Sequence, residues 1–516
     1  MKNIISFIGI LSGILCITGC SKLKENPIGI LSPEGFFKTQ KDVEAAIFDG
    51  YGLLSSDAIY GRFFNGTGLE LRSDMVAIGN LGTAPERIQV NDFNVNASSG
   101  LTGRWWPIFY QVISAENTAD QGADLIEASD EIKNQLKAEA RFVRAFSYYH
   151  LVQIFGDLPY IDKPVSDPAA AKSMGKTPAA EVWGKIIEDF KFAKEHLPDQ
   201  QPGDVRSRPT KATAAAFLAS AYLTTHDYQN ASTEAKWVID NKVAYNYELE
   251  ADYQDLFNGD KMDGLKEPLF VIDYASDISG EYQVLPSGIA LCNNCDVMGP
   301  MTAVGAPALT IGFDVLVPSQ AVYDSWNGLD YRKVVSFDTM VLFTGNVSKY
   351  YTEWPIPRPH IAKYIRYPGS AASPNGTNSS LNYMLMRYAE VLLIAAEALT
   401  EVNGGPTSEA LDYVNQVRAR ARNWAGTIAS FPADVAPGMS KDDFIDLILE
   451  ERKWELAFEG KRWYDIKRRQ LGDKVFKGPD SIEPHSNFDS NRDYLFPIPG
   501  SEIDINANLL PQNNGY

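Results

Sequence analysis

The sequence predicts a mainly α-helical protein built from tetratricopeptide-like helical hairpins, with a loop-rich half that contains a few short strands. Apolar residues recur at helical spacing through long segments on both sides of residue 240. Two of these segments consist of two amphipathic runs with a short polar break between them, which is the pattern of a helical hairpin. Between these two segments, residues 240–380 are rich in Gly, Pro, Asn and Ser and follow no helical period.

The first 19 residues differ in composition from the rest and are predicted to be a signal peptide. Lys2 is followed by the apolar run IISFIGILSGILCI, whose 14 residues are fewer than the roughly 20 that a membrane-spanning helix needs. The run ends in ITGC, which resembles a bacterial lipobox, so Cys20 is the predicted lipidation site. Acyl chains on this cysteine would anchor the protein to a membrane. The alternative is an ordinary signal peptide with an unrelated cysteine.

Residues 20–240 form the predicted N-terminal helical part. Two helices are predicted within residues 107–155, and the pattern ends in GDLPY, at Gly156 and Pro159. A third amphipathic helix, TPAAEVWGKIIEDFKFAKEHL, opens with Thr177 as its N-cap and a proline in its first turn. The segment TKATAAAFLASAYLTTHDYQNASTEAKWVID then predicts a hairpin, because its small residues let two helices approach closely and HDY turns the chain.

Residues 241–380 form the predicted loop-rich variable region, and residues 381–516 the C-terminal helical part and tail. Within the variable region, PLFVIDYA alternates as a short strand would. The C-terminal part opens with a second hairpin, YMLMRYAEVLLIAAEALTEVNGGPTSEALDYVNQVRARA, in which NGG is the break. A further loop-rich zone, residues 55–104, interrupts the N-terminal part. Long ordered loops on a helical frame are frequent sites of ligand binding.

The composition excludes some classes of function. Asp and Glu number 66 against 47 Lys and Arg, and this formal net charge of -19 argues against nucleic-acid binding, which needs a basic field. The five histidines and four cysteines show no metal-ligand spacing, so no metal or other cofactor is predicted. Cys292 and Cys295, in LCNNCD, are predicted to form a disulfide, with two free thiols or a redox pair as the alternatives.

Three glutamates spaced four residues apart, Glu451, Glu455 and Glu459, raise the alternative of carboxylate catalysis. They lie on one predicted helix, from about Asp442 to Arg468, and share its apolar face. A glycosidase needs one carboxyl of raised pKa that faces a second carboxyl across an open cleft. Neighbouring arginines would instead lower the pKa of these carboxyls.

Several arginines are available to pair with these glutamates. Arg462 follows Glu459 by three residues on the same face, and Arg452 flanks Glu455. Other helices supply Arg141, Arg144 and Arg387. Guanidinium–carboxylate bonds between helices would satisfy the buried charges. We therefore predict that the glutamates form structural ion pairs and that the chain has no catalytic residue.

Five stretches of the chain, in order along it, form a specific match to a known family. They are WWPIFYQVISAENTAD, AEARFVRAFSYYHLVQIFGDLPY, LMRYAEVLLIAAEAL, EERKWELAFEGKRWYDIKRR and the tail LFPIPGSEIDINANLLPQNNGY. Together with the lipobox they resemble the SusD/RagB family of outer-membrane nutrient-binding lipoproteins of Bacteroidetes. The resemblance covers about residues 20–240 and 315–516, whereas residues 245–312 match little.

The resemblance implies about four tetratricopeptide-like hairpins that carry a loop-rich ligand-binding half. It also implies a non-catalytic protein at the outer membrane, lipid-anchored at Cys20 and facing the cell surface. Such proteins bind oligosaccharides, or in some members peptides, and deliver them to a SusC-like TonB-dependent transporter. Some members carry an acidic run after the lipidated cysteine as a surface-export signal, whereas SKLKENP is mostly basic or neutral here.

The two loop-rich zones, 55–104 and 241–380, contain most of the candidate ligand-binding residues. Sugar sites combine flat aromatic rings with polar groups that match paired hydroxyls. The candidates are Asp74, Arg87, Asn96 and Trp105 in or beside the first zone, and Tyr282, Tyr350, Tyr351 and Trp354 in the second. The alternative for each aromatic residue is burial beneath a loop, and for Asp74 and Arg87 it is a local salt bridge.

The predicted function is non-catalytic binding of oligosaccharides or polysaccharide fragments at the cell surface, for delivery to the transporter. An oligopeptide-binding member of the same family is the nearest alternative. Two alternatives come from other classes of protein, a glycoside hydrolase and a helical-repeat scaffold for envelope assembly.

Overall fold

The computed structural model describes residues 33–79, 81–274, 315–343, 347–354, 356–364, 366–367, 369–370 and 380–516. Cys20, Tyr282 and the predicted disulfide between Cys292 and Cys295 lie outside the described residues. Within them, every helix is too short or too polar to cross a membrane.

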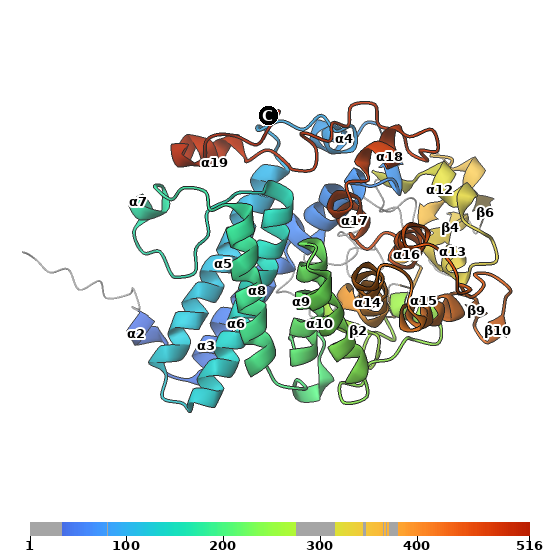
Figure 1. The fold of residues 1–516 in the computed structure, drawn as a ribbon. Coiled ribbons are helices and arrows are strands. Elements are labelled where there is room, and N and C mark those ends of the chain that lie inside the picture. The colour runs from blue at the N-terminus through green and yellow to red at the C-terminus, as the bar shows by residue number, and fades with distance from the viewer. Residues whose placement is uncertain are drawn as a thin grey trace, which may run out of the picture.

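Four successive pairs of helices run side by side through the protein and confirm the predicted fold class (Figure 1). The pairs are α3 (Gln40–Leu54) with α5 (Thr102–Leu125), α6 (Asp130–Phe155) with α8 (Ala179–His196), α9 (Lys211–Thr224) with α10 (Tyr228–Asp240), and α14 (Tyr388–Asn403) with α15 (Ser408–Ala421). Helix α5 also packs on α6, α8 on α9, and α10 on α14. Each pair therefore buries its apolar face against the next pair, as in repeat proteins.

Insertions into this row carry the loops and shorter helices. The segment between α3 and α5 contains the π-helical turns Asp57–Gly61 and Phe63–Leu69, the 3₁₀ turn Glu70–Arg72 and α4 (Pro85–Asn91). The segment between α10 and α14 contains the 3₁₀ turn Tyr253–Phe257, α12 (Gln320–Ser325) and α13 (Tyr331–Ser336). Further short helices are α2 (Pro33–Phe36), α7 (Pro168–Ala171), α16 (Lys441–Glu455), α17 (Arg462–Arg468), α18 (Gly472–Lys477) and α19 (Gly500–Ile505).

The described strands form antiparallel pairs rather than a large sheet. They are β1 (Val76–Ile78) with β3 (Leu316–Pro318), β2 (Pro268–Ile272) with β8 (Tyr383–Arg387), β4 (Phe337–Asp338) with β7 (His360–Ile361), β5 (Met340–Phe343) with β6 (Val347–Tyr350), and β9 (Asn423–Trp424) with β10 (Thr427–Ile428). Val76 lies opposite Pro318. The two loop-rich zones, distant in sequence, are thus joined through β1 and β3.

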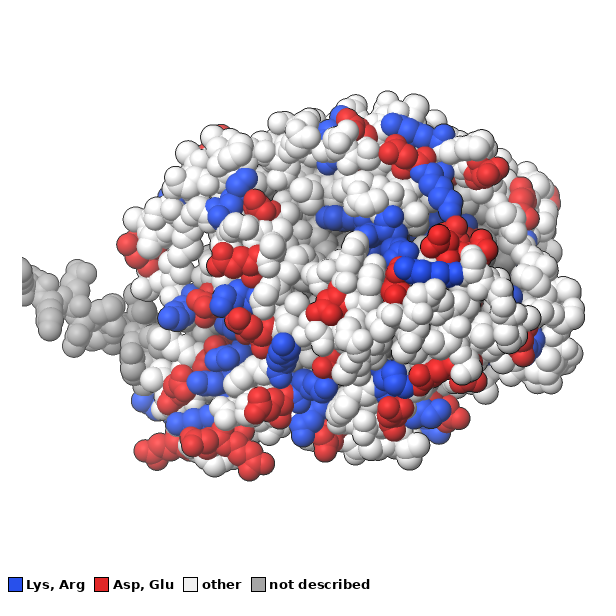
Figure 2. All heavy atoms as spheres, viewed as in Figure 1, with Lys and Arg blue, Asp and Glu red and all other residues white. Residues whose placement is uncertain are grey.

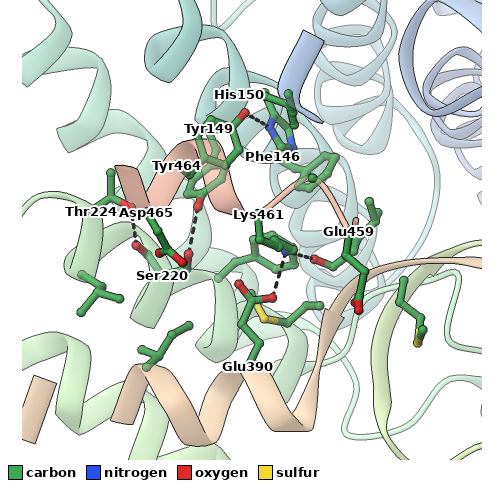
Figure 3. A pocket seen from close by; sticks show the side chains of 18 of the residues that line it. Phe146, Tyr149, His150, Ser220, Thr224, Glu390, Glu459, Lys461, Tyr464 and Asp465 are labelled. Atoms are coloured by element: carbon green, nitrogen blue, oxygen red, sulfur yellow. Dashed lines mark hydrogen bonds and ion pairs between the residues drawn. The ribbon is translucent and has the colours of Figure 1, made fainter. Parts of the chain in front are cut away.

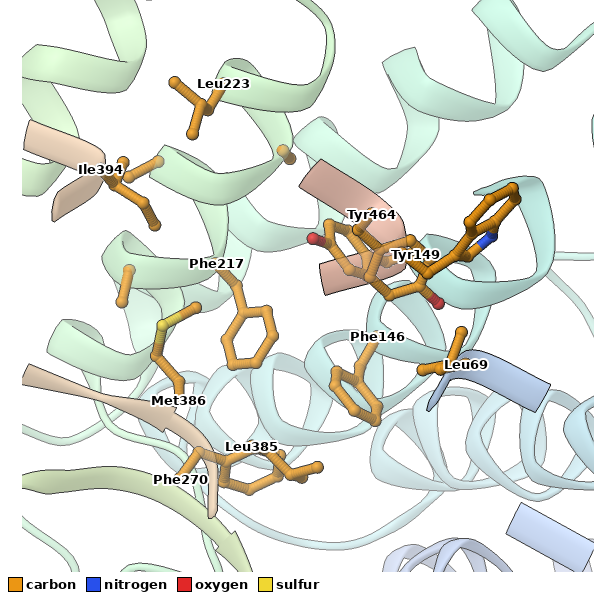
Figure 4. Packing of buried hydrophobic residues seen from close by; sticks show 14 of the residues in the cluster. Leu69, Phe146, Tyr149, Phe217, Leu223, Phe270, Leu385, Met386, Ile394 and Tyr464 are labelled. Carbon is orange, nitrogen blue, oxygen red and sulfur yellow. The ribbon is translucent and has the colours of Figure 1, made fainter. Parts of the chain in front are cut away.

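Aromatic rings fill the space between the helix pairs and the segment that joins α10 to α14. Figure 4 shows Phe146 of α6, Phe217 of α9 and Phe270 of β2 pointing toward one another. The rings of Phe146 and Phe217 lie edge to face with centroids 5.4 Å apart, a favourable geometry for aromatic pairs. Helix α9 approaches its neighbours closely because its inward positions are alanines, which are fully buried.

The predicted single helix from about Asp442 to Arg468 is wrong, because the chain turns between α16 and α17. Phe458 and Gly460 adopt left-handed backbone angles, with φ of 63° and 70°. These angles interrupt a right-handed helix. The Gly460 N–H donates to the Glu70 carboxylate in the first insertion. At this turn the Gly460 N–H therefore bonds to a residue between α3 and α5 rather than to a helical carbonyl.

A buried carboxyl without a hydrogen-bond partner lies between α3 and α5. Glu116 of α5 is fully buried, and no described residue hydrogen-bonds either of its side-chain oxygens. A Cβ on Gly50 of α3 would lie 1.9 Å from Glu116 Oε1, so a larger residue there would displace this carboxyl. Burial, with the nearby charge of Glu139, raises the pKa of Glu116 well above its usual 4.5.

We expect Glu116→Gln to gain stability relative to the wild type as the pH rises above 4.5. Folding makes the wild-type carboxyl take up a proton there, so wild-type stability falls by up to about 1.4 kcal/mol per pH unit until the raised folded pKa is reached. Glutamine does not titrate. Urea unfolding of both proteins at pH 5 and pH 8 measures the effect, and an equal difference at both pH values would contradict it.

Candidate functional site

The three glutamates lie in a buried network of ion pairs, which we call the carboxylate–arginine network. Its acids are Asp330, Glu267, Glu451, Glu455 and Glu459, and its bases are Arg332, Lys363, Arg387, Arg418 and Arg420. Most of these side chains are almost completely buried. The five acids and five bases balance in charge, as burial of so many ions requires.

Arg387, at the end of β8, connects three carboxylates of the network. Its guanidinium lies 2.5 Å from Glu455 and 2.7 Å from Glu267, and its Nε donates to Glu459 at 2.9 Å. Arg420 of α15 bonds to Glu267 and Glu455 as well. The network therefore links the segment between α10 and α14, the fourth helix pair and α16 to one another.

The residues of the predicted structural ion pairs are ion-paired, but of the five arginines predicted to serve the three glutamates only Arg387 bonds to them, and the other four have different partners. Arg462 binds Asp74 with two hydrogen bonds, of 2.7 and 2.9 Å. Arg452 pairs with Asp465 at 2.8 Å. Arg141 and Arg144 of α6 pair with Asp120 of α5 and Asp189 of α8, respectively, rather than with the glutamates. The turn between α16 and α17 accounts for the first change, because it carries Arg462 away from Glu459 and toward the first insertion.

The network does not have the electrostatics of an acid catalyst. Burial by itself would raise the pKa of Glu455, but the guanidiniums of Arg420, Arg387 and Arg332 hold it well below its usual value. Burial is likewise outweighed at Glu459, where Arg387 and Lys363 lower the pKa. Both carboxylates stay ionised at neutral pH, whereas the acid of a glycosidase must be protonated.

A small internal cavity of about 40 Å³ lies beside this network (Figure 3). His150 lies between two tyrosines, with Tyr60 Oη 2.8 Å from Nε2 and Tyr464 Oη 2.7 Å from Nδ1. Nearby, Lys461 pairs with Glu390 at 2.9 Å. Burial lowers the pKa of His150 well below 6.5, so the ring is neutral. The space suits about one water molecule, whereas ligand pockets measure roughly 300–1,000 Å³.

Three candidate ligand residues are buried, which contradicts their predicted exposure to a ligand. Asp74 is 2% exposed and bound by Arg462. Trp105 has no exposed surface and packs against Phe64 and Phe496. Trp354 is 4% exposed, its indole N–H donates to the Lys349 carbonyl at 3.2 Å, and its ring lies against His360.

Arg87 and Asn96 are accessible, but each is engaged within its own loop. Arg87 is half-buried, donates to the Thr83 hydroxyl at 3.0 Å and lies over the ring of Phe63. Asn96 is exposed, and its side-chain oxygen accepts hydrogen bonds from the backbone and hydroxyl of Ser98. These contacts hold both side chains within the segment between α3 and α5.

Tyr350 and Tyr351 are accessible and meet a third tyrosine that was not predicted. The rings of Tyr350 and Tyr351 lie 4.5 Å apart, and Tyr351 lies 5.9 Å from Tyr323 of α12. Tyr350 is 40% exposed and the other two are half-buried. We call these three residues the tyrosine cluster. Sequence reasoning missed Tyr323 because nothing in a single chain pairs it with residues far along the sequence.

Polar groups surround the tyrosine cluster. The Lys333 ammonium lies 4.2 Å from the centre of the Tyr323 ring. Gln320 and the exposed Asp324 hydrogen-bond to each other at 3.0 Å on the same short helix as Tyr323. Glu353 accepts a hydrogen bond from the Tyr350 backbone N–H at 3.3 Å. Burial and the neighbouring Tyr350 raise the pKa of Tyr323 to about 12, so its hydroxyl remains protonated.

Distant segments hold the base of the tyrosine cluster. The backbone N–H of Ser319, at the start of α12, donates to the Met75 carbonyl at 3.0 Å. Its hydroxyl donates to the Ile482 carbonyl at 3.1 Å. The cluster therefore rests on both the first insertion and the C-terminal part. Flat rings with carboxylate, amide and hydroxyl groups around them match the alternating apolar and polar surface of a sugar.

Comparison with known proteins decides the family. One family model, described as the SusD family, matches residues 345–516, and another, described as starch-binding associating with outer membrane, matches residues 71–223. A SusD-like protein, P2, of Formosa agariphila is 47% identical over 512 residues, covering 98% of both chains. The chain belongs to the SusD family. Its relatives also include SusD-like protein P25 of the same organism, at 26% identity over 100% of this chain and 99% of the relative.

Solved structures share the fold of this SusD-family protein. A SusD homologue from Bacteroides thetaiotaomicron superposes with a TM-score of 0.79 at 19% identity, covering 94% of this chain and 98% of that one. A laminarin-binding SusD-like protein gives a TM-score of 0.75 at 22% identity, covering 93% and 100%. The helix-pair architecture predicted from the family resemblance is thereby confirmed, and the family's description associates it with the outer membrane.

Proposed function

We propose that this SusD-family protein binds a glycan at the tyrosine cluster, does not cleave it, and delivers it to a SusC-like TonB-dependent transporter. The observation that carries the proposal is the accessible group of Tyr323, Tyr350 and Tyr351, with amide and carboxylate groups beside it. Structural relatives include a surface glycan-binding protein in complex with laminarihexaose, at a TM-score of 0.75. That similarity supports a glycan as the class of ligand.

A glycoside hydrolase is disfavoured by the carboxylate–arginine network. Its glutamates are ion-paired and buried, so no described pair among them faces an open cleft. A lipid anchor on Cys20, facing the cell surface, would place the tyrosine cluster where polysaccharide fragments arrive. A peptide ligand is the second candidate, because tyrosine rings also bind extended peptides.

Electrophoresis through gels that contain different polysaccharides tests glycan binding. We expect a neutral polysaccharide to retard the mature protein, and a matched gel without polysaccharide to show the reference mobility. Free oligosaccharide should restore that mobility, whereas a pool of peptides should not. The proposal would be contradicted if no polysaccharide changed the mobility of the protein, while a gel with linked peptides retarded it and free peptides relieved that retardation. Co-purification with an outer-membrane TonB-dependent barrel protein tests the transporter partner.

A further inference from the structure

An open groove lies between the helix pairs and α17, and its lining shares no residue with the pocket beside the Asp74–Arg462 pair. It has a volume of about 540 Å³. Its lining includes Gln153 of α6, Trp183 of α8, His226 of the α9–α10 turn, Lys467 of α17 and Asn513 of the tail. Figure 2 shows basic side chains beside a hollow at the upper centre of the molecule, where Figure 1 places α17. The volume suits one or two sugar units.

Lys467 differs from the basic residues that follow it on the chain. Arg468 pairs with Glu397 and Asp465, and Arg469 pairs with Glu401. Lys467 instead donates a hydrogen bond to the Gln153 backbone carbonyl, and no described carboxylate forms an ion pair with it. Its charge is therefore uncompensated within the described part of a chain whose net charge is -19. A partly buried cation of this kind is stabilised by an anion that enters from outside.

The other groups around the groove suit a sugar ring better than a bare ion. Trp183 is half-buried and contacts Tyr149 edge to face, with centroids 5.6 Å apart. His226 Nε2 lies 3.0 Å from the Arg468 carbonyl and donates to it, so in the neutral ring Nδ1 is the acceptor. An aromatic side chain, an acceptor nitrogen and a cation thus line one groove.

We propose that this groove binds a hexuronate unit of an acidic glycan, with the carboxylate on Lys467 and the sugar ring against Trp183. The inference extends the proposed glycan-binding function by adding a second site, separate from the tyrosine cluster, that selects for acidic sugars. A carboxylate accepts up to two hydrogen bonds from an ammonium group, and charge-assisted bonds of this kind are the strong ones. Neutral glycans can accept a hydrogen bond from Lys467 but lack the carboxylate that makes this bond a charge-assisted one.

Charged and titratable groups near Lys467 define the expected pH dependence. Asp157, His226 and Arg468 line the same groove. Asp157 is committed to the first turn of α8, where its carboxylate accepts the Ala179 N–H at 2.8 Å. Burial lowers the pKa of Lys467 to about 7. Affinity for a uronate should therefore be higher at pH 6 than at pH 8.5, and a His226→Gln variant separates any contribution of the imidazole.

Isothermal titration of the mature protein with digalacturonate, at low salt, tests the site. We expect Lys467→Met to weaken binding at least tenfold, Lys467→Arg to retain it, and Lys474→Met, which removes an equally charged but exposed lysine, to leave it unchanged. A neutral digalactoside and free acetate should bind far more weakly than digalacturonate. Circular dichroism verifies that the variants are folded, and if Lys467→Met does not fold, Lys467→Arg and the pH comparison still decide.

Equal affinity for digalacturonate in the wild type and Lys467→Met would overturn the proposal. Equal binding of the neutral digalactoside, or equal losses of affinity in Lys467→Met and Lys474→Met, would also overturn it. So would an affinity of the His226→Gln variant that does not change between pH 6 and pH 8.5. Failure here is distinguishable from failure of the proposed function. Lys467→Met should still be retarded by a neutral polysaccharide, and a Tyr351→Ala variant should still bind digalacturonate.

Discussion

Arg387→Met should lower the free energy of unfolding by about 3–5 kcal/mol, because it leaves buried carboxylates without their shared partner. Arg387 contacts Glu267, Glu455 and Glu459, and its own side chain is 1% exposed. Methionine fills much of the same space but cannot compensate negative charge. Urea unfolding followed by circular dichroism measures the loss, and a reduced yield of folded protein is expected alongside it.

Arg422→Met is the matched control for this prediction. Arg422 pairs with Asp434, whose side chain is 59% exposed, and exposed ion pairs contribute roughly 0–1 kcal/mol. The two variants lose the same charge from the same chain. Equal effects of the two substitutions on stability would show that the carboxylate–arginine network is not the structural element described above.

Replacing both Tyr350 and Tyr351 by alanine should weaken binding of a retarding polysaccharide by at least tenfold. Each ring removed eliminates apolar contact area, and interface tyrosines that act as anchors contribute roughly 2 kcal/mol or more when truncated. The two rings lie 4.5 Å apart and form one surface, so the double variant should lose more than either single variant. Affinity electrophoresis over a series of polysaccharide concentrations gives the change in affinity.

Tyr367→Ala controls for the general loss of an exposed tyrosine. Tyr367 is 41% exposed, close to the 40% of Tyr350, and is not part of the tyrosine cluster. Its variant should migrate as the wild type does in every gel. Wild-type retardation of the double variant, or equal losses in the double variant and Tyr367→Ala, would exclude the tyrosine cluster as the glycan-binding surface.

Helical periodicity predicted two hairpins and three further helices because the signal is local, whereas the number of hairpins came from the family resemblance. Each amphipathic run and its break lie within about 35 residues, and the Ala-rich face of α9 indicated close packing directly. The turn at Phe458 and Gly460 was missed because apolar residues continue at helical spacing through it. The helix is interrupted where Gly460 forms a hydrogen bond with the distant Glu70. A local sequence pattern does not contain such a contact.

The candidate site was only partly predictable for the same reason. Buried charge on an apolar face indicated that Glu455 and Glu459 need arginines, and Arg387 was found. Glu267, Arg332 and Lys363 were not, because they lie 92–192 positions before Glu455 and Glu459, in a region without periodicity. The composition of the loop-rich zones identified their aromatic residues, but it did not predict which of them are exposed to solvent. Trp105 and Trp354 are buried, whereas the adjacent Tyr350 and Tyr351 are accessible.

We propose that the protein holds an intact glycan on its tyrosines while its paired glutamates take no part in chemistry. A crystal structure of the mature protein, soaked with an oligosaccharide that relieves retardation, tests both halves at once. We predict an uncleaved oligosaccharide against Tyr323, Tyr350 and Tyr351, with Arg387 still bonded to Glu455 and Glu459. Density for a shortened product, or for sugar placed between Glu451 and Glu455, would contradict this account.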